Sequence, residues 1–301
     1  MKRCVLTAMA ISAWACVGAA GCASGGQPRA TPDRGATLEE NFARAKAAHE
    51  ADPGNEDAAI WHGRRLAYLG RYTEAIGVYS DALRLHPNSF RLLRHRGHRF
   101  ITVRELDLAI ADLDRAAILI EGVPDEVEPD GAPNAQNKPR STSHSNIWYH
   151  LALAHYLKGD FARAADAWAR CMEFSRGNDD MLVATSYWLY LSLRRAGRTD
   201  GAGRVLEPIR AGMDVIENHA YHRLLLLYKG ELTEDQVRGT AGDGPGETAV
   251  ADATVGYGLA VWRLIRGDRA GARVAFERVL NAGGSNRAAF GFIAAEAELA
   301  R

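Results

Sequence analysis

The sequence predicts an all-α protein built from helical hairpins that repeat along the chain. Residues 56–89 and 90–121 align when one segment is shifted by 34 positions, so that Gly63 falls on Gly97. Each segment shows two apolar patterns of helical period, separated by a short break such as Leu69-Gly70-Arg71. A fixed period of this length is typical of stacked supersecondary units. We therefore expect one α-solenoid of helix-turn-helix repeats, without strands.

Small and large residues take different places in each predicted hairpin. Gly63 and Ala75 stand where the two helices of one hairpin approach closely, and Ala82 stands where the second helix meets the next unit. Tyr79 is one of the large residues that fill the space between the helices. Pro87 ends the second helix, because proline lacks the N–H donor and clashes with the preceding turn.

This order of small and large residues resembles the tetratricopeptide repeat family. The first unit carries its pattern at Gly63, Gly70, Tyr72, Ala75, Tyr79, Ala82 and Pro87. The resemblance implies a right-handed superhelix with units at about 56–89, 90–121, 145–176, 183–211, 216–237 and 253–282, of which 216–237 is degenerate. Within residues 38–301, helices at 38–52 and 286–301 are expected to cap the two ends of the solenoid.

Residues 1–21 have the features of a secretory signal peptide. Lys2 and Arg3 supply a positive start, and an uncharged stretch of apolar and small residues follows. The run Ala19-Ala20-Gly21-Cys22 resembles a bacterial lipobox, in which the cysteine becomes the lipidated first residue of the mature protein. That family usually has Leu where Ala19 stands, and simple cleavage of a secretory signal is the alternative.

Lipidation would place the protein on a membrane of the cell envelope. Residues 22–37 are small, polar and rich in Gly and Pro, which favours a flexible tether. In a source with two membranes, Ala23-Ser24 after the cysteine favours the periplasmic face of the outer membrane, by resemblance to bacterial lipoproteins.

The charge balance argues against nucleic acid as a partner. The chain has 37 basic and 37 acidic side chains, so it has no general attraction to polyanions. We expect no cofactor. The pairs His95/His98 and His219/His222 lie several units apart, whereas zinc needs three or four converging ligands, so no metal site is expected. Cys171 takes a position that is usually alanine in the family, which indicates a buried residue.

The resemblance implies that the first helix of each unit lines a concave face. The residues expected to contact a partner there are Arg64, Tyr68, Arg91, Arg94, His98, Asn146, Tyr149, Tyr156, Tyr187 and Arg194. Arginine offers paired donors to carboxylates, and tyrosine offers rigid contact area. We expect a non-enzymatic scaffold that binds an acidic protein or peptide segment. The alternative is a solvated basic face whose arginines pair with neighbouring carboxylates.

The insert at 122–144 interrupts the repeats, and an irregular loop of this length is often functional. Its first half is acidic, with Asp125, Glu126, Glu128 and Asp130. Three interpretations remain open: a lid whose acidic half lies on Arg91, Arg94 and Arg99; a part of the partner site; or an enzyme or small-ligand site within 122–150. The enzyme interpretation would use His144 and His150 with a carboxylate, but the chain has no nucleophile motif or phosphate loop.

Overall fold

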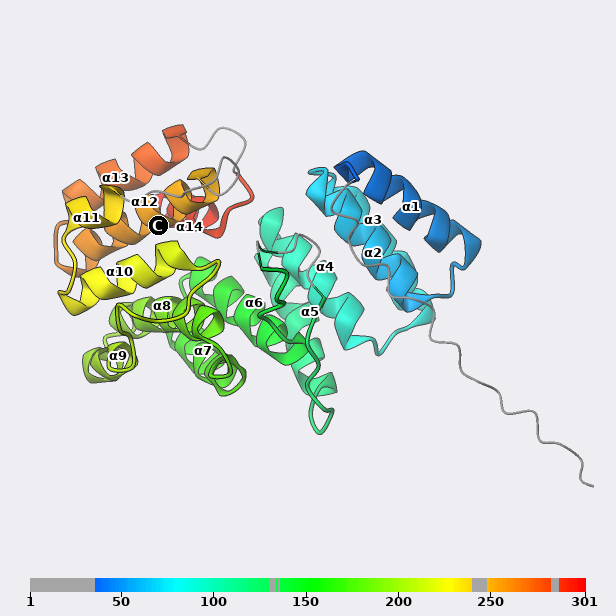
Figure 1. The fold of residues 1–301 in the computed structure, drawn as a ribbon, viewed down its shortest axis with the longest axis horizontal. Coiled ribbons are helices and arrows are strands. Elements are labelled where there is room, and N and C mark those ends of the chain that lie inside the picture. The colour runs from blue at the N-terminus through cyan, green and yellow to red at the C-terminus, as the bar shows by residue number, and fades with distance from the viewer. Residues whose placement is uncertain (1–35, 130–133, 135, 240–247, 283–286) are drawn as a thin grey trace, which may run out of the picture.

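The computed structural model describes residues 36–129, 134, 136–239, 248–282 and 287–301. These residues form 14 α-helices, and the described part of the chain contains no strand beyond one isolated bridge between Val127 and Thr142. The predicted all-α, tetratricopeptide-like solenoid is therefore confirmed. The helices follow one another around a curved path, so that the C-terminal helices return toward the middle of the chain (Figure 1).

The helices are arranged mainly as consecutive pairs. Helix α1 (Leu38–Ala51) precedes the first pair, α2 (Glu56–Tyr68) and α3 (Tyr72–Leu85). The pairs that follow are α4 (Phe90–Thr102) with α5 (Leu106–Leu119), α6 (Ser143–Lys158) with α7 (Phe161–Ser175), α8 (Asp179–Arg195) with α9 (Thr199–Leu206), α10 (His219–Lys229) with α11 (Glu234–Gly239), and α12 (Thr248–Ile265) with α13 (Arg269–Ala282). Helix α14 (Phe290–Leu299) closes the described chain.

Local sequence signals determine where several helices begin and end. Asn55, Ser89 and Asn178 each accept a hydrogen bond from a backbone N–H in the first turn of the following helix, which satisfies a donor that has no partner inside the helix. Helix α6 ends at Gly159, whose φ of 85° lies in the left-handed region that glycine adopts without strain.

Two glycines allow the helices of a hairpin to approach closely. A Cβ atom at Gly63 would lie 2.3 Å from Cε1 of Tyr79, and a Cβ atom at Gly97 would lie 2.7 Å from Cγ of Leu113. Both distances are far below van der Waals contact. The 34-residue repeat therefore has a steric cause, because the same close approach recurs in two successive units.

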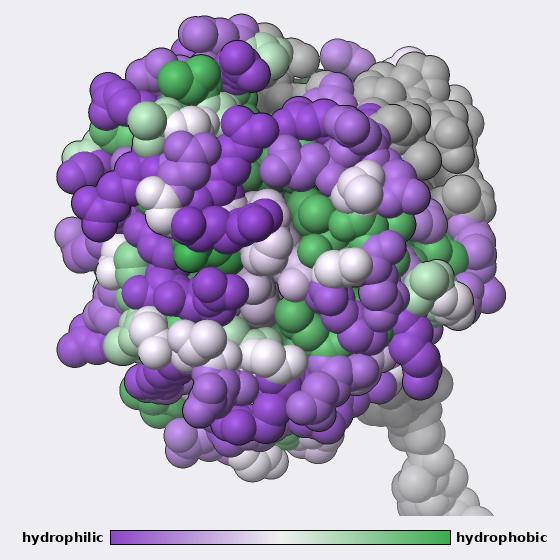
Figure 2. All heavy atoms as spheres, turned by 90° about the vertical axis from the view of Figure 1, so that its left-hand side faces the viewer, coloured by the Kyte–Doolittle hydropathy of each residue, from purple (hydrophilic) through white to green (hydrophobic). Residues whose placement is uncertain are grey.

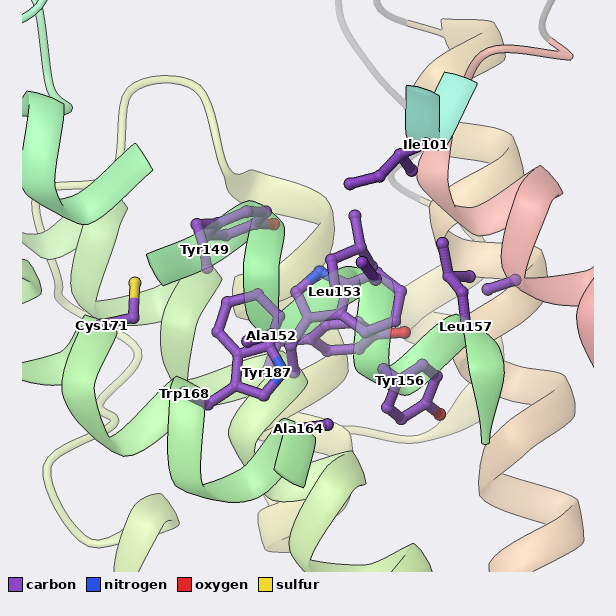
Figure 3. Packing of buried hydrophobic residues seen from close by; sticks show 14 of the residues in the cluster. Ile101, Tyr149, Ala152, Leu153, Tyr156, Leu157, Ala164, Trp168, Cys171 and Tyr187 are labelled. Atoms are coloured by element: carbon purple, nitrogen blue, oxygen red, sulfur yellow. The ribbon is translucent and has the colours of Figure 1, made fainter. Parts of the chain in front are cut away.

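The core is richest in aromatic residues in the middle of the chain. Tyr149 meets Trp168 edge to face at 4.7 Å between ring centroids (Figure 3). Trp168 in turn stacks on Trp188, with 6.4 Å between ring centroids. Cys171 is fully buried beside this group, as the sequence predicts, and burial raises the pKa of its thiol to about 11. Offset and edge-to-face aromatic pairs add about 1 kcal/mol each to the stabilisation from burial.

Helix α14 closes the curve of the solenoid. It packs on α12 and α13 and also reaches α6. Two ion pairs reinforce this closure: Arg104 with Glu296 at 2.6 Å, and Arg195 with Glu298 at 2.5 Å. Arg104 adopts a φ of 68°, which is uncommon for a residue with a Cβ atom.

The outer surface of the C-terminal half is mainly hydrophilic, with smaller hydrophobic areas between the polar side chains (Figure 2). Among the described helices, none combines the length and the apolar character needed to cross a membrane. Cys22, the predicted signal peptide at 1–21 and nearly all of the predicted tether lie outside the described residues.

Candidate partner-binding groove

The insert between α5 and α6 folds back on itself next to the first helices of the solenoid. The backbone N–H of Glu128 donates to the carbonyl of Ser141 at 3.0 Å, and the N–H of Ser143 donates to the carbonyl of Glu126 at 2.8 Å. These two bonds pair the acidic half of the insert with its second half in an antiparallel arrangement. They hold the Glu128 side chain in one place relative to α6.

The second half of the insert is tied to α8. Arg140 lies with its Nε 3.2 Å from a carboxylate oxygen of Asp180, which is fully buried. Asp180 also accepts hydrogen bonds from the backbone N–H groups of Ile216, Glu217 and Asn218, at 2.9 to 3.1 Å. This anchor was not predicted from the sequence, because its parts lie in three segments that are distant in the sequence.

Glu128 binds side chains from three helices. Its carboxylate lies 3.1 Å from Nη2 of Arg94 on α4 and 3.8 Å from Nη1 of Arg64 on α2. The amide of Asn146 on α6 donates to it at 3.0 Å. Arg64 also donates to the backbone carbonyl of Pro129 at 2.9 Å. The side chains of Arg64, Arg94 and Glu128 are only 11 to 12% exposed, so water screens these charges weakly.

His95 completes this contact as a neutral imidazole. Its Nδ1 accepts a hydrogen bond from Nη1 of Arg94 at 2.8 Å, which places the ring proton on Nε2, 3.8 Å from Glu128. Burial lowers the pKa of His95 well below its ordinary value, and the charge of Arg94 lowers that pKa further. The groove therefore owes its positive charge to arginine rather than to histidine.

The predicted groove residues do not all lie together. Arg64, Arg94, His98 and Tyr68 line one cavity of about 120 Å³ between α2, α3 and α4. Arg91 lies on the same face of α4, but it pairs with Asp57 at 2.5 Å and Glu56 at 3.7 Å within the solenoid. Arg194 lies far along the chain and donates to the hydroxyl of Tyr190 at 2.8 Å.

Three of the four predicted contact tyrosines are buried, which corrects the expectation of an open aromatic face. Tyr149, Tyr156 and Tyr187 are 8%, 1% and 0% exposed, respectively (Figure 3). The hydroxyls of Tyr156 and Tyr257 lie 2.6 Å apart, which joins α6 to α12. Helices α10, α12 and α14 cover these positions, so the tyrosines pack in the core and do not line a surface.

The acidic half of the insert meets only part of the basic face that the lid interpretation named. Glu128 reaches Arg94, as that interpretation requires. Arg91 instead pairs within the solenoid, and no carboxylate among the described residues pairs with Arg99. Asp125 accepts a hydrogen bond from the backbone N–H of His144 at 3.0 Å, at the start of α6. Glu128 thus joins the acidic half of the insert to Arg64 and Arg94, while Arg140 joins the second half to Asp180.

His144 and His150 have different surroundings. Nδ1 of His144 lies 3.9 Å from Asp125, and its ring meets Phe174 at 5.1 Å. Nδ1 of His150 donates to the carbonyl of Asn146 at 2.6 Å, and its ring lies 4.1 Å from that of His98. In the part of the chain that the structure describes, no group of three or more His, Cys, Asp or Glu side chains could hold a metal ion.

Comparisons with known proteins show distant structural similarity alone. No family model matches the sequence. No curated protein sequence matches it either. The structure is similar to that of MamA, at 17% identity over 65% of this chain and 87% of that chain, with a TM-score of 0.43. A tetratricopeptide repeat protein from Parabacteroides merdae is 15% identical over 85% of this chain and 92% of that chain, with a TM-score of 0.49.

A third similar structure is that of YrrB, which is described as a tetratricopeptide protein with an unusual peptide-binding site. It is 14% identical over 84% of this chain and 97% of that chain, with a TM-score of 0.42. Because all three TM-scores are below 0.5, these similarities carry no argument about the partners of this chain.

Proposed function

We propose that the chain is a non-enzymatic scaffold that binds an acidic segment of a partner protein along α2 and α4. One observation carries this proposal: Arg64 and Arg94, from consecutive repeat units, already hold the carboxylate of Glu128. Glu128 belongs to an irregular segment laid against the helices, which is the form that a bound peptide would have. A partner carboxylate would bind the same guanidinium groups when it displaces the insert.

The proposed location is the cell envelope, with lipid attached at Cys22. The support is the sequence alone: the charged start, the apolar stretch and the run Ala19-Ala20-Gly21-Cys22. The tether at 22–37 would then hold the solenoid near the membrane surface. Metabolic labelling with a fatty acid tests this part; loss of label in Cys22→Ala supports it, and an unlabelled wild-type protein contradicts it.

The binding proposal is tested by crosslinking and pull-down from native membranes. The bait is the full-length protein, compared with Arg94→Ala/His98→Ala. The matched control is Arg84→Ala/His86→Ala, which removes the same residue types at the end of α3. We expect one partner to be captured by the wild type and the control and lost from the groove variant. Equal capture by all three proteins would contradict the proposal.

A variant of the insert provides a second test in the same pull-down. Glu128→Ala removes the carboxylate that occupies the arginine pair, so we expect it to increase capture of the same partner. Glu121→Ala removes an exposed carboxylate seven positions before Glu128 and serves as the charge-matched control. A decrease in capture with Glu128→Ala would mean that the insert forms part of the partner site.

A further inference from the structure

A second feature of the same region is a cavity of about 120 Å³ between α2, α3 and α4. Three arginines line it, Arg64, Arg94 and Arg99, together with the rings of Tyr68, Tyr79 and His98. Tyr68 is 38% exposed, so the cavity lies within reach of solvent. Its volume is about four times the share of one water molecule in the liquid, which is room for a small polyatomic group.

The charges around this cavity do not balance. Arg64 and Arg94 share the single carboxylate of Glu128. Arg99 pairs with no carboxylate among the described residues, and its guanidinium faces the ring of Tyr72 at 5.7 Å. Three cations against one carboxylate leave two positive charges without a counter-charge. Buried charges are ordinarily paired, because desolvation of an unpaired charge is costly.

Two further observations indicate that a ligand completes the site. The Nε of Arg94 is buried and has no hydrogen-bond partner in the described structure. Burial lowers the pKa of Arg94 and of Arg99, and the mutual repulsion of the arginines adds to this effect. His98 does not add charge, because burial and the nearby Arg99 lower its pKa well below the ordinary value.

We propose that this cavity binds a phosphate-class dianion, either inorganic phosphate or a phosphate monoester, through the guanidinium groups of Arg94 and Arg99. A phosphate monoester carries a charge of about −1.5 to −2 at pH 7, which matches the two uncompensated positive charges. The planar fork of arginine matches phosphate oxygens as well as carboxylate oxygens. A single carboxylate would supply only half of the missing charge.

This inference goes beyond the proposed function, because it requires no partner protein and leaves Glu128 in its place. Arg99 distinguishes phosphate binding in the cavity from partner binding in place of the insert. It lines the cavity, whereas the contact with the insert is made by Arg64, Arg94, His95 and Asn146.

The first experiment is isothermal titration of the full-length protein in detergent with inorganic phosphate at pH 7.5. The test variant is Arg99→Met, which keeps the apolar stem and removes the charge. The control is Arg84→Met on α3, an exposed arginine that pairs with Asp81. We expect one phosphate per chain, at least tenfold weaker binding in Arg99→Met, and unchanged binding in Arg84→Met. Absence of saturable binding, or equal affinity in Arg99→Met, would overturn the inference.

Thermal unfolding gives an independent readout. Without phosphate, Arg99→Met should raise the Tm, because it removes a charge that lacks a counter-charge. Phosphate should raise the Tm of the wild type more than that of the variant, because the variant binds it at least tenfold more weakly. A purely structural Arg99 would give the opposite result, a lower Tm in the variant with no dependence on phosphate.

Two further ligands identify the source of the dianion. Tighter binding of O-phosphoserine than of inorganic phosphate supports a monoester ligand, and the reverse order supports free phosphate. Tighter binding of succinate than of either would overturn the assignment. Partner capture that depends on Arg94 and His98, in a protein that binds no phosphate, would leave the proposed function standing and refute this inference alone.

Discussion

The first helices of the early repeat units and those of the later units use corresponding positions in opposite ways. On α2 and α4, Arg64 and Arg94 lie beside cavities and hold a carboxylate from the insert. On α6 and α8, Tyr156 and Tyr187 are 1% and 0% exposed and form part of the aromatic core. The same repeat pattern thus places charged side chains beside the insert at one end and aromatic side chains in a covered core at the other.

The difference arises from contacts between helices that are distant in the sequence. Helix α14 packs on α6, and α12 packs on α8, so the concave side of the later units is filled by the chain itself. On the early units, α14 reaches α4 through Phe290, whose ring lies 5.5 Å from that of His98, and the insert lies against α2 and α4. Charged side chains are tolerated beside the insert because Glu128 and solvent can compensate them. In the later units, Asp180 and Arg195 are each paired with an opposite charge, Arg140 and Glu298.

The largest expected effect concerns the aromatic core. Trp188 is fully buried, and Trp188→Ala should lower the free energy of unfolding by roughly 3–5 kcal/mol, because it removes a large side chain and leaves a cavity. The control is Trp148→Ala, where the indole is partly exposed and lies 5.4 Å from the guanidinium of Arg170. Urea unfolding followed by circular dichroism measures both. Equal losses would contradict the division between core and surface.

The next effect concerns the close approach of the helices in the first unit. Gly63→Ala places a Cβ atom 2.3 Å from the Tyr79 ring, so we expect a loss of about 1–3 kcal/mol from overpacking. Gly77→Ala on α3 is the matched control, since a Cβ atom there has no neighbour within 4 Å. That change should stabilise the helix by roughly 0.5–1 kcal/mol. Stabilisation by both changes would refute the steric explanation of the repeat.

A smaller effect is expected at the insert. Glu128→Ala should lower the free energy of unfolding by about 2 kcal/mol, because it leaves Arg64 and Arg94 partly buried without their shared carboxylate. Glu121→Ala, which removes an exposed carboxylate, should change stability by less than about 0.5 kcal/mol. Chemical denaturation of the two variants provides the comparison, and a neutral Glu128→Ala would mean that the insert is not held by this contact.

The smallest effect near neutral pH involves His98 and His150, whose rings lie 4.1 Å apart. Burial lowers the pKa of each well below the ordinary value, and the charges of Arg94 and Arg99 lower both further. As the pH falls, these histidines therefore take up protons in the unfolded chain before they do so in the folded protein. The folded state keeps its full free energy of unfolding above about pH 6.5 and loses part of it as the pH falls below that value. Melting curves between pH 7.5 and 5.5 should show a smaller decrease for His150→Asn than for the wild type, while His86→Asn keeps the full decrease.

Much of the solenoid could be predicted because its causes are local and periodic. Gly63 and Gly97 recur where helices approach closely, and Asn55, Ser89 and Asn178 begin helices by accepting backbone hydrogen bonds. Even residues 216–237, whose repeat pattern is degenerate, contribute α10 and most of α11. The candidate site was predicted in part: Arg64, Arg94, His98 and Tyr68 do meet at one cavity, whereas Arg99 was named only as a contact of the lid and Tyr79 only as a packing residue.

The amino-acid sequence by itself determined the helices, their pairing and the small residues at the points of closest approach, because each depends on neighbours within one or two repeat units. The tertiary structure alone decided which concave positions remain accessible and where the insert lies. Tyr187 is buried because α10 and α12 pack on α8. Glu128 reaches Arg64 because the insert, which joins α5 to α6, folds back against α2. Such contacts depend on the curvature of the whole solenoid, which no local pattern encodes.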